Sequence, residues 1–280
     1  MQHFYIVTNR HKDPELKVTS RIKKFIEERG GSCIVQIKEP SPQTKTKITN
    51  DIEGMLVLGG DGTMLQAARD TVEKRIPMLG INMGTVGYLA EIELPGIENA
   101  LEKLLKDEYE LEERRMLIGT VKKEGQEPSE DWALNDIAIT RCGSLQVIKY
   151  SIYVNDQFLY SYSADGVIVA TPTGSTGYNL SAGGPIVEPK AKLLMITPIC
   201  PHTLNTRSII LSAEDRIEIE IDSGREGEKL EVEANFDGSH KVTLMTGDRI
   251  EIRQSGKKTD IIKLSNVSFL EVLHKKMNEK

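Results

Sequence analysis

The sequence predicts an α/β fold joined to an all-β fold: an N-terminal open, mostly parallel sheet with flanking helices, then an antiparallel, β-sandwich-like domain. Over residues 1–106, short apolar runs alternate with stretches of helical spacing, which is typical of a parallel sheet covered by helices. From about Met116 onward, strand-like segments follow one another, which is typical of antiparallel sheets packed face to face. We therefore expect an N-terminal domain at 1–106, a β-rich domain at 107–265 and a short C-terminal segment at 266–280.

The N-terminal part contains four short apolar runs that are separated by helix-like stretches. We predict that these runs are strands: residues 4–8, 33–37, 54–58 and 76–81. After the first run, Asp13 is expected to cap a helix that has Pro14 at its first position. A further helix is expected over 95–106, where apolar side chains recur at helical spacing. In such sheets ligands bind beyond the carboxyl ends of the strands, and the glycine-containing segments at 59–63 and 82–87 follow two of them.

The β-rich part is predicted to consist of short strands. They are expected at residues 132–140, 147–154, 157–162, 216–222, 229–234 and 241–246. The clearest is 216–222, in which three isoleucines alternate with acidic residues, as expected for a strand with one buried face. Asn155-Asp156 separates two of these segments and favours a hairpin turn. The polar run at 122–131 is expected to be a loop or hairpin tip, and residues 269–277 a short helix.

The composition argues against several kinds of partner. The chain has 280 residues, of which 39% are hydrophobic, and this is adequate for one large or two modest domains. A formal net charge of −6 does not favour a nucleic-acid surface, and no apolar run approaches the roughly 20 residues of a membrane span. The three cysteines, Cys33, Cys142 and Cys200, form no C-x-x-C pair. We therefore expect neither a disulfide framework nor a zinc site, and a cytoplasmic location fits.

A glycine-rich acidic string directly follows the third predicted strand. It consists of Gly59, Gly60, Asp61, Gly62 and Thr63, and a helix-like stretch comes next. Glycines let backbone N–H groups approach a phosphate, and a helix N-terminus adds partial positive charge. A carboxylate beside phosphates is repulsive unless it takes part in chemistry, so Asp61 is predicted to be a base for a hydroxyl proton or a ligand-orienting group. The structural alternative is a tight turn in which Asp61 caps the helix.

A second segment, at 165–187, is rich in hydroxyl groups and glycines and contains an apolar strand. Small hydrogen-bonding side chains beside exposed backbone suit ribose hydroxyls, an adenine edge or phosphate oxygens. The candidate binding residues here are Asp165, Thr173, Ser175, Thr176, Gly177, Tyr178, Asn179, Leu180 and Ser181. The alternatives are an ordinary polar loop, a packed amphipathic aromatic at Tyr178 and a turn former at Asp165.

Taken together, these motifs resemble the NAD kinase family. The matching pieces occur in family order: the string at 59–63, the glycine-containing segment at 80–89, the pair Asn135-Asp136 and the hydroxyl-rich segment at 171–185. The first is shared with lipid kinases and phosphofructokinases, whereas the last is much more specific. Two positions depart from the family. Asp136 stands where Glu is more frequent and reaches less far, and Gly177 stands where Ala is common, which leaves the loop more flexible.

The resemblance implies a reaction and its participants. NAD kinases transfer the terminal phosphoryl group of ATP, and in some members of polyphosphate, to the 2′-hydroxyl of the adenosine ribose of NAD, giving NADP. Asp61 then matches the base for that hydroxyl, and Asn135 and Asp136 match contacts to the adenosine part of the dinucleotide. Further dinucleotide contacts are implied at Asp165, Thr176, Tyr178 and Ser181. The resemblance also implies a homodimer or homotetramer and a C-terminal segment that returns to the first domain.

The implied chemistry uses Mg²⁺ or another divalent metal. No dedicated carboxylate cage is visible in the sequence, so we predict no protein metal ligand and expect the metal to be carried largely by ATP. The glycines of the first string, Gly59, Gly60 and Gly62, are expected to offer backbone donors to phosphates.

Two other functions stay open from the sequence. One is a lipid kinase of the diacylglycerol or sphingosine type, which shares the Gly-Gly-Asp-Gly element but has no need of the segment at 171–185. The other is a dinucleotide sensor without catalysis, which has no need of a base at Asp61. For Asp136, a strand-edge or turn carboxylate is the structural alternative.

Overall fold

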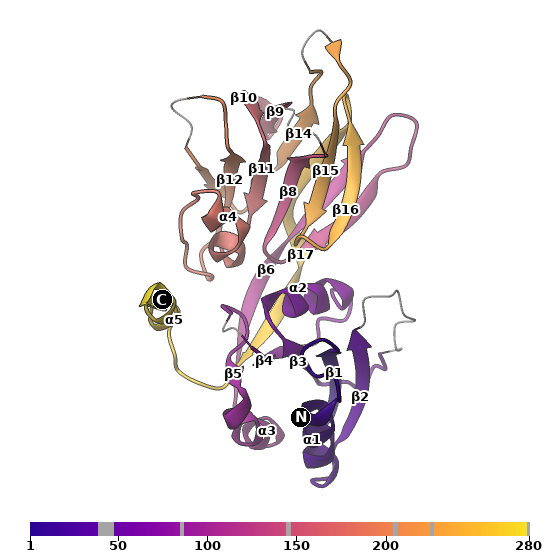
Figure 1. The fold of residues 1–280 in the computed structure, drawn as a ribbon, viewed down its shortest axis with the longest axis vertical. Coiled ribbons are helices and arrows are strands. Elements are labelled where there is room, and N and C mark those ends of the chain that lie inside the picture. Colours follow the sequence, from indigo (N-terminus) through magenta and orange to yellow (C-terminus); the bar gives the residue numbers. More distant parts are fainter. Residues whose placement is uncertain (39–47, 85–86, 144–146, 204–206, 225–226, 279–280) are drawn as a thin grey trace. The chain divides into compact units, whose positions relative to one another are not determined.

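The chain forms two compact units in a computed structural model that describes residues 1–38, 48–84, 87–143, 147–203, 207–224 and 227–278 (Figure 1). Unit one comprises Met1–Glu113 and Thr259–Lys280, and unit two comprises Arg114–Lys258. The sequence-based boundaries lie near these, at 106/107 and 265/266. The difference arises because the chain leaves and re-enters unit one within two long strands, β6 (Glu110–Lys122) and β17 (Arg249–Lys263). A strand that continues through a boundary gives no composition change or turn to mark it.

Unit one is built on a parallel sheet. Its strands lie in the order β2 (Ser32–Lys38), β1 (His3–Asn9), β3 (Gly54–Gly59) and β4 (Met78–Asn82). All of these neighbours pair in parallel, so their carboxyl ends share one edge. The end of β17 pairs with β4 on the far side, and the two-residue strand β5 (Ile92–Glu93) also pairs with β4.

The described residues of unit one form the helices α1 (Lys17–Glu27), α2 (Asp61–Asp70), α3 (Ile97–Leu105) and α5 (Phe269–Asn278). Apolar residues of α1 and α3, such as Ile22 and Leu101, form one buried cluster with Phe4 and Leu56 of the sheet. The turn η1 (Leu94–Gly96) precedes α3, so that helix begins two residues later than predicted. Among the described residues, no helix is long and apolar enough to cross a membrane.

The predicted start of α1 is wrong. The helix begins at Lys17, and Leu16 before it adopts a left-handed conformation with φ 53°. The Asp13 carboxylate nevertheless accepts hydrogen bonds from the backbone nitrogens of Val18 at 3.3 Å and Thr19 at 2.9 Å. Asp13 therefore satisfies first-turn N–H groups from outside the helix, across a turn that the sequence pattern did not reveal.

The strands of unit two, within its described residues, are arranged in two sheets. One contains β10 (Gln157–Ala164), β9 (Ile148–Val154), β14 (Ile217–Ile221) and β17 in that order, with β6 on β17 and β7 (Ser129–Ala133) on β6. The other has the order β13 (Ile209–Ser212), β12 (Leu193–Ile199), β11 (Gly166–Ala170), β8 (Asp136–Arg141), β15 (Glu231–Phe236) and β16 (His240–Met245). The pairs along the second sheet are all antiparallel.

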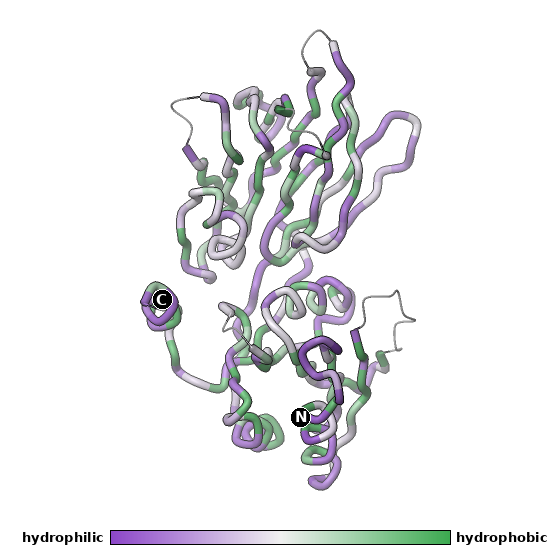
Figure 2. Tube along the Cα trace, in the orientation of Figure 1, coloured by the Kyte–Doolittle hydropathy of each residue, from purple (hydrophilic) through white to green (hydrophobic). Residues whose placement is uncertain are grey.

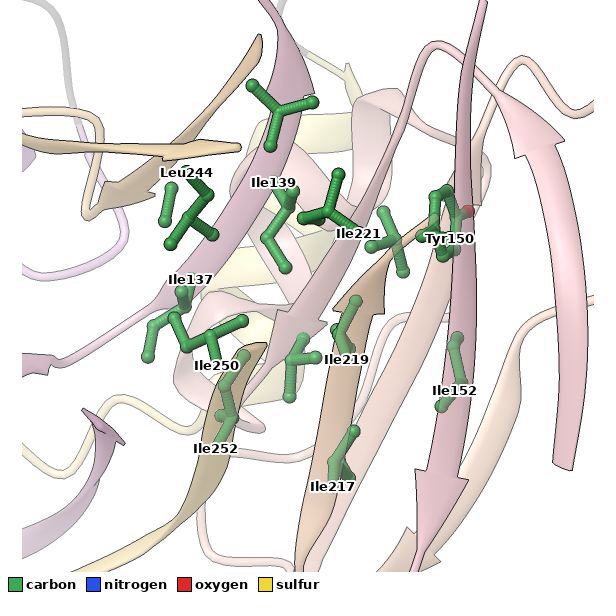
Figure 3. Packing of buried hydrophobic residues seen from close by; sticks show 14 of the residues in the cluster. Ile137, Ile139, Tyr150, Ile152, Ile217, Ile219, Ile221, Leu244, Ile250 and Ile252 are labelled. Atoms are coloured by element: carbon green, nitrogen blue, oxygen red, sulfur yellow. The ribbon is translucent and has the colours of Figure 1, made fainter. Parts of the chain in front are cut away.

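The core of unit two contains residues from both sheets. Ile217, Ile219 and Ile221 of β14 are buried together with Ile137 and Ile139 of β8 (Figure 3). The strict alternation predicted for β14 is therefore confirmed, and the alternating hydropathy is visible along the strands (Figure 2). The fully buried Tyr150 donates its hydroxyl to the Gly166 carbonyl at 2.9 Å, which satisfies the polar group of a large core side chain.

The predicted continuous strand at 132–140 is wrong. The structure divides it into β7, which ends at Ala133, and β8, which begins at Asp136. Leu134 and Asn135 lie between the two strands, which belong to different sheets. The sequence also did not indicate β12, which is buried along most of its length and therefore lacks the alternation of a one-faced strand.

Candidate active site

The Gly-Gly-Asp-Gly string lies at the carboxyl end of β3 and begins α2. Gly59 is the last residue of β3, Gly60 caps α2 and Asp61 is the first helical residue. A Cβ on Gly59 would lie 2.3 Å from Thr63 Oγ1, so the turn from strand to helix itself requires glycine there. Among the residues that the structure describes, a Cβ on Gly60 or Gly62 would meet nothing within 4 Å. These two glycines therefore leave open space beside the helix N-terminus, where N–H groups lack intrahelical partners and favour an anion.

Both carboxylate oxygens of Asp61 accept hydrogen bonds from the segment after β4. The backbone nitrogen of Tyr88 lies 2.7 Å from Oδ2, and that of Leu89 lies 3.1 Å from Oδ1. The alternative in which Asp61 caps α2 is wrong, because Gly60 is the N-cap and Asp61 is the first residue of the helix. The carboxylate is thus fixed by a segment 27 residues away in the sequence, and each oxygen keeps a further lone pair for a ligand proton.

Gly87 is the residue that permits this contact. A Cβ at Gly87 would lie 1.8 Å from Asp61 Oδ1 and 2.3 Å from its Cγ. No side chain fits in that space, so the carboxylate rests against bare backbone. The two positions before Gly87, Thr85 and Val86, were included in the predicted loop but lie outside the described residues.

The end of β4 adds polar groups at the same edge of the sheet. Asn82 Oδ1 accepts a hydrogen bond from the Gly84 backbone nitrogen at 2.9 Å, and the Met83 nitrogen donates to the Gly59 carbonyl at 3.1 Å. Lys12, in the loop after β1, holds its Nζ 3.1 Å from where a Gly84 Cβ would be. Sequence reasoning missed Lys12, because a single lysine in a loop carries no motif; only its place after a parallel strand could have indicated it.

In unit two, the pair Asn135-Asp136 lies where β7 gives way to β8. The turn between β15 and β16 and the turn after β11 both bond to this stretch. Thr171 donates its backbone nitrogen to the Asn135 carbonyl at 2.9 Å and its hydroxyl to the Leu134 carbonyl at 2.7 Å. A Cβ on Gly174 would lie 2.1 Å from the Asn135 carbonyl oxygen. The backbone of the pair is therefore packed directly against the hydroxyl-rich segment.

Asp136 is buried, and Asn135 is partly buried with its side-chain oxygen inaccessible. Asp136 is 5% exposed, and burial raises its pKa to about 7, with the charge of Asp237 adding to the effect. Asn135 Oδ1 is buried and has no hydrogen-bond partner among the described residues. A buried acceptor without a partner is costly in a protein and is a feature of sites that await a ligand.

The hydroxyl-rich segment forms η2 (Thr173–Thr176) and the single turn α4 (Tyr178–Ser181). Two predicted contacts, Ser175 and Asn179, have side chains that are fully buried and bonded to the protein itself. The Ser175 hydroxyl lies 3.0 Å from both the carbonyl oxygen and the nitrogen of Val187, and Asn179 Oδ1 accepts from Thr197 at 2.7 Å. Thr173 is also buried, with Arg114 donating to its hydroxyl at 3.4 Å. These side chains hold the segment in shape.

Other predicted residues of this segment face outward. Tyr178 is 44% exposed and Leu180 38% exposed, and Ser181 is also exposed. The pKa of the Tyr178 hydroxyl is raised by burial and then by the charges of Asp136, Cys200 and Asp165. Gly177 lies close to the pair, since a Cβ there would be 3.1 Å from Asn135 Nδ2. The Thr176 hydroxyl donates to the Thr173 carbonyl at 3.5 Å, so it belongs to the turn.

Asp165 stands apart from the Asn135-Asp136 pair. It precedes β11, whereas the pair lies at the other end of that strand, beside Ala170. Arg141 Nε forms an ion pair with its carboxylate at 3.2 Å. The charge of Asp165 nevertheless acts on the Tyr178 hydroxyl, as does that of Asp136, and both raise its pKa.

A metal cage is not formed by side chains in the described ranges. No three His, Cys, Asp or Glu side chains converge there as a metal-binding group requires. Asp61, the acidic residue of the phosphate-type loop, has both oxygens directed to backbone N–H groups. The donor set present here does not by itself fit a resident divalent metal.

The fold and these two loops define a class of protein. A parallel sheet with an acidic glycine loop at a helix N-terminus, joined to a β-sheet unit with a hydroxyl-rich loop, is the architecture of a nucleotide-dependent phosphotransferase. Residues 27–109 match the ATP-NAD kinase N-terminal domain family, and residues 134–264 match the ATP-NAD kinase C-terminal domain family. The chain is 46% identical to an NAD kinase of Lachnospira eligens over 99% of this chain and 100% of that one. It is 44% identical to an NAD kinase of Lachnoclostridium phytofermentans over the full length of both.

The chain therefore belongs to the NAD kinase family. Two solved structures share its fold at 24% identity: yeast NADH kinase complexed with NADH, with a TM-score of 0.79 over 99% of this chain and 87% of that one, and an NAD kinase from Archaeoglobus fulgidus in complex with ATP, with a TM-score of 0.78 over 98% of both. The predicted family, fold class and enzyme class are confirmed. The lipid-kinase and sensor alternatives are not favoured, because the matches to NAD kinases run the length of the chain.

Proposed function

We propose that the protein transfers the terminal phosphoryl group of ATP, or of polyphosphate, to the 2′-hydroxyl of the adenosine ribose of NAD, giving NADP. The observation that carries the proposal is Asp61 at the start of α2, with its carboxylate held by the Tyr88 and Leu89 backbone nitrogens beside the open space at Gly60 and Gly62. An acid fixed next to an anion site is costly unless it acts on the substrate.

Asp61 is the proposed general base. The two backbone hydrogen bonds orient the carboxylate but leave a lone pair on each oxygen for the ribose hydroxyl. A carboxylate is too weak a base to deprotonate a free alcohol outright. It can accept the proton late, as the new O–P bond forms and the hydroxyl becomes acidic, and it orients the nucleophile before that.

The phosphate groups are proposed to bind at the N-terminus of α2. Backbone N–H groups near Gly60 and Gly62 supply donors, and within the described part of the chain no atom lies within 4 Å of where a Cβ on either glycine would be. Lys12 supplies a positive charge from the loop after β1, next to Gly84. Gly59 acts indirectly, because its packing against Thr63 sets the direction in which α2 leaves the sheet.

The dinucleotide is proposed to bind to unit two through Asn135, Asp136 and Tyr178. Asn135 offers a buried acceptor, and Asp136 offers a carboxyl group that is partly protonated near neutral pH and can then donate. Thr176, Gly177, Leu180 and Ser181 border this surface. Ser175, Asn179 and Thr173 support it from behind through their hydrogen bonds to the protein.

A divalent metal such as Mg²⁺ is proposed to come with the ATP phosphates, whose charge it offsets. No step is assigned to a protein metal ligand. We also propose a cytoplasmic location, as well as a homodimer or homotetramer, since sheet edges such as β10 and β16 offer surfaces for pairing.

The experiment is a phosphoryl-transfer assay with the full-length chain, Mg²⁺ and radiolabelled ATP. NAD, sphingosine and diacylglycerol are offered as separate acceptors, and product from NAD is identified with an NADP-specific dehydrogenase. We expect label in NADP alone. Label in a lipid with none in NAD would contradict the proposal, and so would NAD binding without turnover from either ATP or polyphosphate.

A further inference from the structure

The turn between β15 and β16 places one carboxylate against the backbone of the Asn135-Asp136 pair. Asp237 Oδ1 accepts hydrogen bonds from the nitrogens of Asn135 at 2.8 Å and Asp136 at 3.2 Å, and its Oδ2 accepts from Leu134 at 2.8 Å. These three consecutive residues span the point at which β7 has ended and β8 begins. Hydrogen bonds to an ionised carboxylate are stronger than neutral ones, so the carboxylate sets the course of the chain here.

The conformation of the turn makes this reach possible. Asp237 has φ 50° and Gly238 has φ 64°, which are left-handed values typical of a two-residue hairpin turn. The Asp237 nitrogen donates to the Asp136 carbonyl at 3.0 Å, so the turn and the pair are bonded in both directions. Asn and Asp tolerate this backbone region better than other residues with a Cβ. The partner lies 101 residues earlier in the sequence, which is why the contact was not predicted.

The opposite side of the pair is closed by unit-two backbone. Thr171 bonds to the carbonyls of Leu134 and Asn135, and Gly174 leaves no room for a Cβ beside the Asn135 carbonyl. The N–H groups of residues 134–136 donate to Asp237, and the carbonyls of Leu134 and Asn135 accept from Thr171. These bonds restrict the backbone conformation of residues 134–136. The directions of the Asn135 and Asp136 side chains follow from that, including the buried Asn135 oxygen, which has no partner in the part of the chain that the structure describes.

We infer that Asp237 is a positioning residue for dinucleotide recognition: it holds the backbone of Leu134, Asn135 and Asp136 so that the two polar side chains face the substrate. This inference rests on the proposed role of Asn135 and Asp136 in binding NAD. Both oxygens of Asp237 accept hydrogen bonds from the backbone nitrogens of this stretch, so the role that we assign to it is to hold the pair. Its negative charge also favours the protonated form of Asp136, which a neutral cap would not do.

The test compares Asp237→Asn and Asp237→Ala with Asp248→Ala in the full-length chain. Asp237→Asn keeps a side chain suited to the turn and one acceptor oxygen. It therefore provides a measurement even if Asp237→Ala does not fold. Asp248 is the matched control, because its carboxylate accepts from the Met245 nitrogen at 2.9 Å in the turn at the other end of β16. NAD affinity is measured by calorimetry, together with kcat and the KM values for NAD and ATP and the melting temperature.

We expect both Asp237 variants to weaken NAD binding by about tenfold or more, in line with the loss of a charge-assisted bond network. The KM for ATP should stay unchanged, and Asp248→Ala should leave NAD binding unchanged. Wild-type NAD affinity in Asp237→Asn would overturn the inference, and so would an equal loss in Asp248→Ala, since that would indicate general destabilisation. If the wild type did not bind NAD, the proposed function itself would be contradicted. The wild type is measured first, so this outcome is distinguished from a failure of the inference about Asp237.

Discussion

At the scale of single residues, the site depends on a carboxylate that touches bare backbone. Asp61 rests against Gly87 and accepts from the two nitrogens that follow it. Because Gly87 has no Cβ, the Asp61 carboxylate can lie directly against its backbone, and this contact sets the direction of the Asp61 side chain. A change at Gly87 should therefore act on chemistry more than on the stability of unit one.

Gly87→Ala should lower kcat by roughly a hundredfold, because its Cβ would lie 1.8 Å from Asp61 Oδ1 and must displace the carboxylate. The KM for NAD should change much less. Steady-state kinetics on the variant checks this, with Gly96→Ala as control, since the nearest atom to a Cβ there is 3.8 Å away. Unaltered kcat in Gly87→Ala would show that the position of Asp61 does not limit the reaction.

Asp136 gives the protein a dependence of stability on pH. Its pKa in the folded state is raised from 3.8 to about 7, by burial first and by Asp237 second. Below pH 3.8 the group is protonated in both states, so its favourable contribution is fully present. As the pH rises toward 7, the unfolded chain ionises more readily than the folded one, and this contribution is lost, up to about 4 kcal/mol.

Asp136→Asn should consequently be more stable than the wild type at pH 8 in the absence of ligand. The difference in the free energy of unfolding should shrink at pH 5, where the wild type keeps most of its protons on Asp136. Urea unfolding of both proteins at the two pH values measures this. Parallel pH profiles for the two proteins would mean that Asp136 ionises normally in the fold.

The residue-scale predictions that succeeded were local ones. The string at 59–63 was predicted to join a strand to a helix, and it does, because glycines, an apolar run and a helical spacing lie within a dozen residues. The roles of Asp237 and Lys12 could not be predicted in this way. Each depends on a partner that is distant in the sequence, and neither residue type is unusual in a loop. Whether Ser175 and Asn179 touch substrate stays a prediction.

At the scale of elements, the junction of β7, β8 and the turn after β11 is the feature that the sequence obscured. Residues 132–140 have the composition of one strand, yet the chain changes sheets at Leu134 and Asn135. The change is stabilised by Asp237 and Thr171, which are not neighbours in the sequence. Composition therefore predicted the strand residues, and only tertiary contacts determine the break between the strands.

Gly174→Ala should destabilise the protein by about 1–3 kcal/mol and weaken NAD binding, because its Cβ would lie 2.1 Å from a backbone oxygen that cannot rotate away. Gly177→Ala is the contrast: its Cβ would lie 3.1 Å from the Asn135 side-chain nitrogen, so a small adjustment suffices. Thermal unfolding measures the stability of the two variants, and NAD titration measures their affinity for NAD. Equal effects in both would argue that the backbone contact at Asn135 is unimportant.

At the scale of the whole molecule, the candidate site residues are distributed over two units of different fold. Unit one provides the acidic glycine loop at the edge of a parallel sheet, and unit two provides the Asn135-Asp136 pair and the hydroxyl-rich segment. The fold class could be predicted from the change of pattern along the chain, because alternating strands and helices give way to strands alone. The oligomeric state could not, since it depends on surfaces whose partners lie in other copies.

The central claim is that Asp61 acts as the base in phosphoryl transfer to NAD, and the most direct test is the rate of NADP formation by Asp61→Asn. The control is Asp70→Asn, which removes a carboxylate from the other end of α2, where it pairs with Lys38 at 2.9 Å. We predict that Asp61→Asn binds NAD like the wild type but that its kcat falls by about 10²–10⁴, while Asp70→Asn keeps its activity. Equal kcat in Asp61→Asn and the wild type would contradict the claim.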